Sequence, residues 1–176
     1  APVRGARLRA LLGVMVADRM MEERLDYREF CHIVTGIDDD PDRARKTLNG
    51  IVFRLREMLG HEVINTDSET PELNLECVEV DILKAYQHIQ QSAAELRSES
   101  LIRSQRELLK ALEYTCGEVP FPGLYEPFFE AVRDDFEGNI RALILKVSRH
   151  LVNERDLRSA EELLRPGFSA MPHDEE

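Results

Sequence analysis

The chain has 176 residues, and its 23 Lys and Arg residues against 34 Asp and Glu residues leave a formal net charge of −11. A composition that is 43% hydrophobic and 32% charged is typical of a folded protein and excludes a wholly disordered chain. The acidic balance excludes a protein that coats nucleic acid indiscriminately, but it leaves room for a local basic surface.

The first two predicted helices follow from apolar spacing and from capping residues. Residues 5–17 carry apolar side chains at helical spacing on one side. Asp26, with Glu29 three residues later, resembles a capping box and predicts a helix over 27–35. Gly36 then stands where a helix end favours a left-handed residue.

The third predicted helix has the strongest start signal in the chain. Asp40 is an N-cap acceptor, and Pro41 stands at the first helical position. The helix is expected to cover 41–59 and to end at Gly60. Its predicted buried stripe has spacings of three and four and consists of Ala44, Leu48, Ile51, Val52, Leu55 and Leu59.

A small hairpin is predicted after the third helix. Two short extended stretches, 63–66 and 72–75, flank the turn-like residues 67–71. From Asp81 onward the pattern is helical throughout. The predicted helices cover about 81–91, 98–114, 127–153 and 156–164, with a break over 115–124 and with Pro166 and Gly167 ending the last one.

The apolar runs and the cysteines indicate the cellular compartment of the protein and whether it contacts a membrane. The longest apolar run, Leu11–Ala17, is too short to span a bilayer, and the first residues lack the layout of a signal peptide. Cys31, Cys77 and Cys116 are far apart and odd in number, which favours a reducing compartment over a disulfide scaffold. We expect a cytoplasmic protein that makes no membrane contact.

No motif in the chain indicates an enzyme, a metal site or a cofactor. The acidic run Asp38–Asp42 fails as a calcium loop, because Arg43 stands where the loop needs glycine. Cys31 and His32 are adjacent and would point apart on a helix, so they do not form a metal site. We expect neither catalysis nor a bound cofactor.

Basic charge gathers on the third predicted helix. Arg43, Arg45, Lys46, Arg54 and Arg56 fall within 43–56 with no acid among them. Such a run can be a solvated helix face. However, the order of three helices followed by a hairpin is that of a winged helix, in which the third helix enters the DNA major groove.

These residues resemble a known family. The segments Arg43–Asn49 and Phe53–Gly60 are similar to the recognition helix of the antibiotic regulatory proteins, whose winged helix is of the response-regulator type. In that family the winged helix is fused to a bacterial transcriptional activator domain. The segment Glu79–Tyr86 resembles the entry into that domain, and Gly117–Glu130 resembles its Gly, Pro-Gly and Tyr-Glu segment, with Phe128 in the place of a tryptophan.

The last two predicted helices also fit a tetratricopeptide frame that starts at Arg141. The matching positions are Val147, Leu151, Ala160, Leu164 and Pro172, with Ser148 and Gly167 in place of the expected small residues. The resemblance implies a winged-helix domain over 1–80, lacking the short N-terminal sheet of the family, and a tetratricopeptide-like helical activator domain over 81–176.

The resemblance implies a transcriptional regulator that binds duplex DNA. The helical half would serve activation, contact with RNA polymerase or self-association as a homodimer. The residues expected to face DNA are Arg28, Arg43, Lys46, Thr47, Asn49 and Arg54.

Three other residues favour an alternative function. Gly50, Phe53 and Glu57 lie on the outer face of the third predicted helix, and the predicted wing carries Asp67 and Glu69 with no basic residue. These features suit a protein-interaction module that keeps the architecture without binding DNA. A helical domain in which Phe53 simply packs against a neighbouring domain is a third interpretation.

Overall fold

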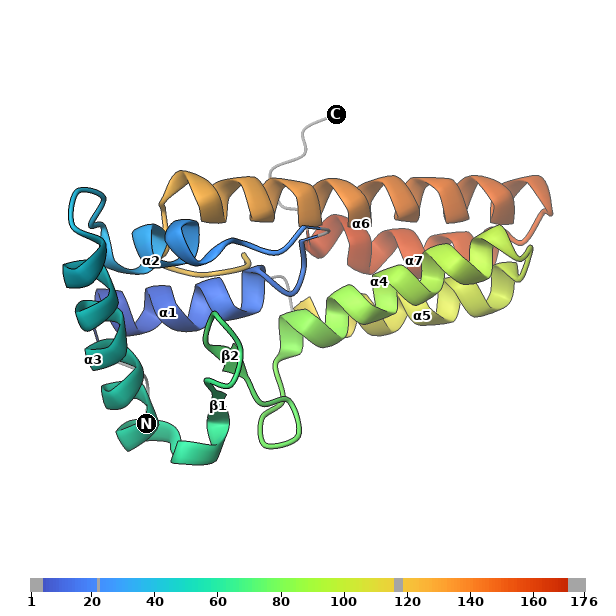
Figure 1. Cartoon of the computed structure of the whole chain (residues 1–176). Helices are drawn as coiled ribbons and strands as arrows, with labels where there is room; N and C mark the ends of the chain where they lie inside the picture. Colours follow the sequence, from blue (N-terminus) through green and yellow to red (C-terminus); the bar gives the residue numbers. More distant parts are fainter. Residues whose placement is uncertain (1–4, 22, 116–118, 171–176) are drawn as a thin grey trace. The chain divides into compact units, whose positions relative to one another are not determined.

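A computed structural model describes residues 5–21, 23–115 and 119–170, the last four of these by their backbone alone. The described residues form a mainly helical protein, as predicted, with a single two-stranded sheet (Figure 1). The elements are α1 (Ala6–Ala17), α2 (Tyr27–Thr35), α3 (Pro41–Leu59), the 3-10 turn η1 (His61–Val63), β1 (Ile64–Asn65), β2 (Glu72–Leu73), α4 (Asp81–Arg97), α5 (Leu101–Thr115), α6 (Pro127–Asn153) and α7 (Leu157–Ala170). No helix in these ranges is long and apolar enough to cross a membrane.

The chain divides into two compact units. The first contains the described residues up to Val80 together with Gly123–Val132, and the second contains those of Asp81–Pro122 and those from Arg133 onward. The predicted domain boundary after residue 80 instead assigned Gly123–Val132 to the second domain.

Helix α1 is the centre of the first unit. It packs against α2, α3 and β2 (Figure 1), and most of its length is buried rather than the one side that the sequence predicted. Gly13 lies so close to the segment after Gly123 that an added Cβ would come within 2.5 Å of Leu124 Cδ1 and 2.9 Å of Phe129 Cε1. Glycine therefore permits the close packing of α1 in this unit.

The predicted helix ends of α2 and α3 are confirmed. The Asp26 carboxylate accepts a hydrogen bond from the Glu29 amide at 2.8 Å, and α2 ends at Gly36 in the left-handed region. The Asp40 carboxylate accepts one from the Arg43 amide at 2.9 Å. These caps satisfy amide groups that a helix cannot pair internally.

One member of the predicted α3 stripe is not buried. Ala44, Leu48, Ile51, Val52 and Leu55 are in the core, whereas Leu59 is 37% exposed. Leu59 is the last residue of α3, and the chain leaves the helix at Gly60, so periodicity alone overestimated how far the packed surface extends.

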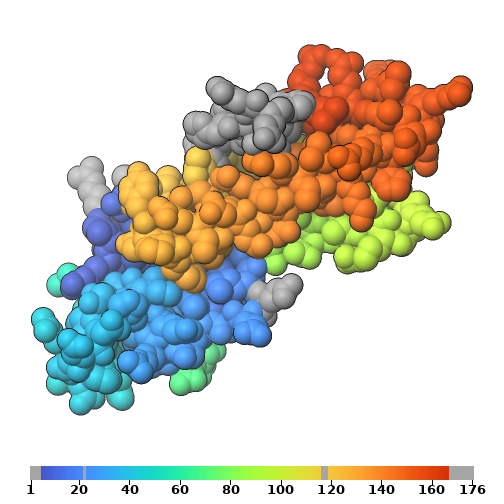
Figure 2. Space-filling view, turned by 90° about the horizontal axis from the view of Figure 1, so that it is seen from above, coloured from blue at the N-terminus to red at the C-terminus, as the bar shows by residue number. Residues whose placement is uncertain are grey.

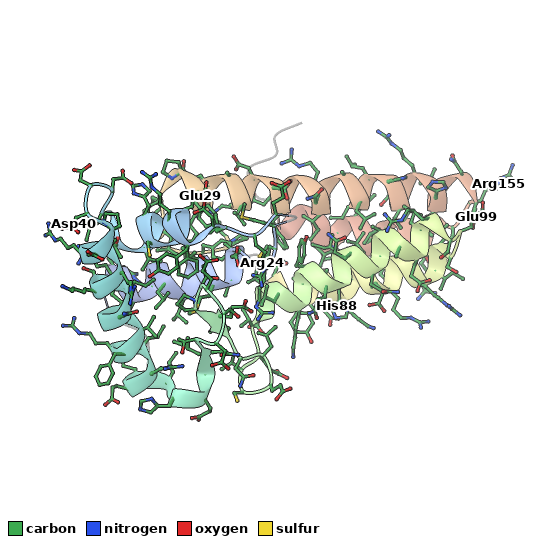
Figure 3. All side chains as sticks on the ribbon, viewed as in Figure 1. Arg24, Glu29, Asp40, His88, Glu99 and Arg155 are labelled. Carbon is green, nitrogen blue, oxygen red and sulfur yellow. The ribbon has the colours of Figure 1, made fainter. Side chains whose placement is uncertain are left out.

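The second unit contains two helix pairs that are closed by the same turn. Glu99 follows α4 and Arg155 follows α6, as the labels in Figure 3 show, and both residues have a positive φ. The next amide in each case bonds five residues back, from Ser100 to the Glu95 carbonyl and from Asp156 to the Leu151 carbonyl, both at 2.9 Å. Both turns are Schellman motifs, in which a left-handed residue ends the helix and a backbone hydrogen bond spans five residues.

Corresponding positions of the two helix pairs are separated by a constant number of residues. Arg155 stands 56 residues after Glu99, and the same offset relates the end of α4 to the end of α6 and the start of α5 to the start of α7. It also relates Ser92 to Ser148, and both serines are buried. The second unit therefore repeats one helix–turn–helix design.

The pair α4 and α5 is joined by polar contacts. Ser92 donates its hydroxyl to the Ser104 carbonyl at 2.8 Å. His88 Nδ1 lies 2.7 Å from Glu107 Oε2, and its ring stacks on Tyr114. The hydrogen bond from Lys110, at 2.8 Å, and then that of His88 lower the pKa of Glu107 against the opposing effect of burial.

Two predicted boundaries in the second unit are wrong. Helix α4 continues to Arg97 rather than to about residue 91, because the residues between them include no glycine or proline. Helix α7 passes through Pro166 and ends at Ala170. A proline removes one helical hydrogen bond and crowds the preceding turn, but here this does not end the helix, whose Leu163 is fully buried.

Candidate nucleic-acid interface

The basic surface of the first unit is carried by α3, which has one buried and one exposed side. With its apolar stripe packed, the opposite side presents Arg43, Lys46 and Arg54 to solvent. Among the described residues, none of the three forms an ion pair. Their charges are therefore available to an external anion.

The other residues expected to face DNA lie around this group. Thr47 is half-buried on the edge that Arg43 and Arg54 share, while Asn49 is exposed on the opposite edge of α3. Arg28 is exposed in the first turn of α2. Helix α3 thus carries five of the six predicted residues, spread from one edge of its exposed side to the other, and the sixth comes from a different helix.

Arg56 differs from the rest of the basic run. Its guanidinium donates to the Ile64 carbonyl, at 2.6 Å from Nη2 and 3.2 Å from Nε. Nη2 also donates to the Thr66 hydroxyl at 3.1 Å. Arg56 therefore fixes strand β1 against α3, and it leaves four of the five cations of the run for the surface.

Arg45 is a surface cation that the predicted set left out. It is exposed on the same side of α3 as Asn49 and interacts electrostatically with the hydroxyl of Tyr27 at the start of α2, as does Glu69 of the hairpin loop. Burial, followed by the interaction with Cys31, raises the pKa of Tyr27 to about 12, against the lowering effect of Arg45. The first turn of α2 therefore lies near both α3 and the hairpin loop. This proximity arises from long-range packing, so no local sequence pattern predicts it.

The three residues of the alternative function share the exposed face. The Phe53 side chain is 60% exposed, and an added Cβ at Gly50 would meet nothing within 4 Å. Glu57 Oε1 lies 3.2 Å from His61 Nε2. The exposed side of α3 therefore carries both cations and an aromatic ring, and it has features of both predicted contacts.

The hairpin is short and is held at its base by charged groups. Strands β1 and β2 pair antiparallel, with Ile64 opposite Leu73. Arg19 Nη2 donates to Glu72 Oε2 at 2.9 Å and to the Leu73 carbonyl at 3.1 Å. Arg24 also contacts Glu72, at 3.5 Å. The segment that follows α1 thereby positions β2.

Buried Asp18 extends this network. It is 4% exposed, forms an ion pair with Arg24, and accepts a hydrogen bond from the Leu25 amide at 2.7 Å. Asp67 and Glu69 at the tip of the hairpin are exposed. The hairpin therefore has a fixed base and an acidic tip, whose sign is opposite to that expected of a DNA-binding wing.

Two observations concern the thiol chemistry and metal binding of the described residues. Burial raises the pKa of the Cys31 thiol, which disfavours the nucleophilic thiolate at neutral pH. The described residues contain no group of three His, Cys, Asp or Glu side chains arranged to hold a metal ion.

Comparisons with protein-family models, with curated proteins and with solved structures found no match to this chain.

Proposed function

We propose that this protein is a transcriptional regulator that contacts duplex DNA through the exposed face of α3. The observation that carries the proposal is the group of three exposed cations, Arg43, Lys46 and Arg54, which have no ion-pair partner among the described residues. They lie opposite the side by which α3 is anchored in its unit. Unpaired cations on a fixed helix suit a row of phosphates, because neutralising phosphates releases condensed counterions.

In this proposal the first unit acts as a winged helix. Helix α3 is the recognition helix, and the hairpin β1–β2 is the wing. Arg43, Lys46 and Arg54, with Arg28 from α2, contact phosphates or guanine edges. Asn49 can form paired hydrogen bonds with adenine, and Thr47 can contact a base edge or a phosphate.

The second unit would be the bacterial transcriptional activator domain, with tetratricopeptide-like helix pairs. The shared turn and the common 56-residue offset of the two pairs support a repeated design. Of the positions in the repeat frame, Val147, Leu151 and Ala160 are buried and Leu164 is half-buried. Pro172 lies outside the described residues. This unit would serve activation through contact with RNA polymerase, or self-association.

The test is binding to a pool of duplex DNA, measured by fluorescence anisotropy at roughly 50 mM salt. The variant carries Arg43→Ala, Lys46→Ala and Arg54→Ala together. The matched control carries Arg97→Ala, Arg103→Ala and Arg106→Ala, which remove the same charge from exposed positions of the second unit. We expect micromolar binding by the unsubstituted chain, a loss of at least tenfold in the first variant, and a change below about threefold in the control.

Two results would overturn this proposal. One is the absence of measurable binding by the unsubstituted chain at that salt concentration. The other is an equal loss in the two triple variants, because binding would then follow total charge rather than the face of α3. Circular dichroism of each variant checks that its helices are intact.

A protein-interaction module is the second candidate function, and the exposure of Phe53 favours it. An aromatic ring that is 60% exposed on a fixed helix is suited to anchor a protein contact. If α3 binds RNA polymerase, Phe53→Ala should weaken capture of the purified enzyme by at least tenfold. Ile102→Ala, which removes another strongly exposed apolar side chain, should leave capture unchanged. Equal capture by the two variants would count against this function.

A further inference from the structure

One face of α6 in the second unit is exposed along nearly five turns and is partly apolar. The residues on it recur at alternating spacings of three and four, and they are Asp135, Gly138, Ala142, Leu145, Arg149 and Val152. All six are exposed, and Leu145 and Val152 are 44% and 48% exposed. We call these six residues the α6 stripe. Figure 2 looks onto α6, drawn in orange, and atoms of this helix are visible at the surface there.

The spacing of the stripe is that of a helix seam that faces another helix. Apolar positions that repeat every 3.5 residues on average are typical of paired helices. At Gly138 an added Cβ would meet nothing within 4 Å, and Ala142 adds only a methyl group. These two small residues leave space beside Leu145, so that a leucine side chain of another helix can approach the backbone of α6 there.

The charges along this part of α6 separate by sign. Asp134, Asp135 and Glu137 are followed, after Gly138, by Arg141, Lys146 and Arg149 with no acid among them. Asp135 accepts a hydrogen bond from Asn139 at 3.1 Å, and this uses only one of its two oxygens. A helix that is acidic in one half and basic in the other complements a copy of itself in the antiparallel direction.

We propose that the α6 stripe binds the same stripe of a second copy of this chain, antiparallel and about a two-fold axis near Ala142. Asp135 and Arg149 lie seven residues on either side of Ala142, so the axis places Asp135 of each copy opposite Arg149 of the other. Leu145 of each copy then inserts beside Gly138 and Ala142 of the other. Such an interface is self-complementary, as two-fold symmetry requires.

The size of the stripe sets the strength of the dimer. Six residues on one helix bury less than the roughly 800 Å² per partner of a standard stable interface. The dimer should therefore be weak, with a Kd of about 10 to 100 μM. The rim ion pairs select the partner and its direction more than they add affinity.

The experiment is sedimentation velocity of the whole chain over roughly 5–300 μM at low salt, a range that brackets the expected Kd. The unsubstituted chain should shift from monomer to dimer over this range. Asp135→Arg and Arg149→Asp should each abolish the shift, because each places like charges opposite one another twice in the symmetric dimer. An equimolar mixture of these two variants should form a heterodimer, since opposite charges then face each other at both contacts.

The mixture keeps the test valid if one substitution disturbs folding, because a misfolded variant cannot restore association. Arg106→Asp on α5 removes a positive charge from another helix and is the matched control, expected to dimerise normally. A chain that stays monomeric to the highest concentration would overturn the proposal. Single variants that still self-associate would also overturn it, as would a mixture of the two variants that fails to associate. DNA binding by α3 enters none of these measurements, so the two proposals can fail separately.

Discussion

Of the described glycines, Gly13 is the one at which an added Cβ would come closest to a neighbouring atom. An alanine Cβ there would come within 2.5 Å of Leu124 Cδ1 and 2.9 Å of Phe129 Cε1. Both neighbours are buried, so relieving the clash requires shifts in a packed core. We expect Gly13→Ala to destabilise the protein by about 1–3 kcal/mol, measured as a lower urea midpoint at unchanged slope.

The matched control is the same substitution in α3. Gly50 is also inside a helix, but an added Cβ there meets nothing within 4 Å. Gly50→Ala should therefore stabilise the protein by about 0.5–1 kcal/mol, because alanine has the higher helix propensity. If both substitutions stabilise the protein, α1 does not approach Leu124 and Phe129 as closely as described.

Residues that act locally could be predicted from the sequence, and residues that act at long range could not. Asp26 and Asp40 cap their helices as expected, because a cap depends on the next three residues. Arg56 looked like its basic neighbours, yet it donates to Ile64 eight residues later. The proximity of Tyr27 to Arg45 and Glu69 likewise depends on how three elements pack, and no local pattern records that.

Among the secondary-structure elements, the repeated helix pairs of the second unit offer an internal comparison. Ser92 and Ser148 are equivalent under the 56-residue offset and are both buried. Ser92 Oγ bonds the carbonyl and the hydroxyl of Ser104 at 2.8 and 2.9 Å. The position equivalent to Ser104 is Ala160, and Ser148 Oγ has no hydrogen-bond partner within the described part of the chain.

Alanine substitution should therefore have opposite effects at the two serines. Ser92→Ala should cost about 1–3 kcal/mol, because it leaves a buried hydroxyl of Ser104 with one partner fewer. Ser148→Ala should be neutral or stabilising by up to about 1 kcal/mol, since it removes a buried hydroxyl that has no partner. Thermal unfolding of the two variants under the same buffer tests the difference. Equal destabilisation would show that Ser148 has a partner after all.

At this scale the sequence predicted every α-helix of the described structure but not every boundary. Starts were accurate where a cap or proline acts locally, as at Asp40 and Pro41. Ends were less accurate, because Pro166 is accommodated within α7 and because α4 continues past residue 91. The 56-residue offset was visible only in backbone geometry, since the turn residues Glu99 and Arg155 share a conformation and not a residue type.

For the whole molecule, the net charge of −11 opposes DNA while the face of α3 attracts it. Screening decides which of the two dominates. At 0.1 M salt the Debye length is about 10 Å, so charges farther than this from a phosphate contribute little to its binding. The local group on α3 should therefore set the affinity at physiological salt, and the acidic remainder should matter only at low salt.

The salt dependence of DNA binding reports how many phosphates the basic residues neutralise. If Arg28, Arg43, Lys46 and Arg54 each neutralise one phosphate, the logarithm of the binding constant should fall with the logarithm of salt concentration with a slope of about −3.6. Lys46→Ala should make the slope less steep by about 1, whereas Arg106→Ala on α5 should leave it unchanged. Anisotropy titrations between about 50 and 200 mM salt measure these slopes. A shallow slope would mean that α3 does not engage phosphates, and equal changes in the two variants would mean that the attraction is spread over the molecule rather than concentrated on α3.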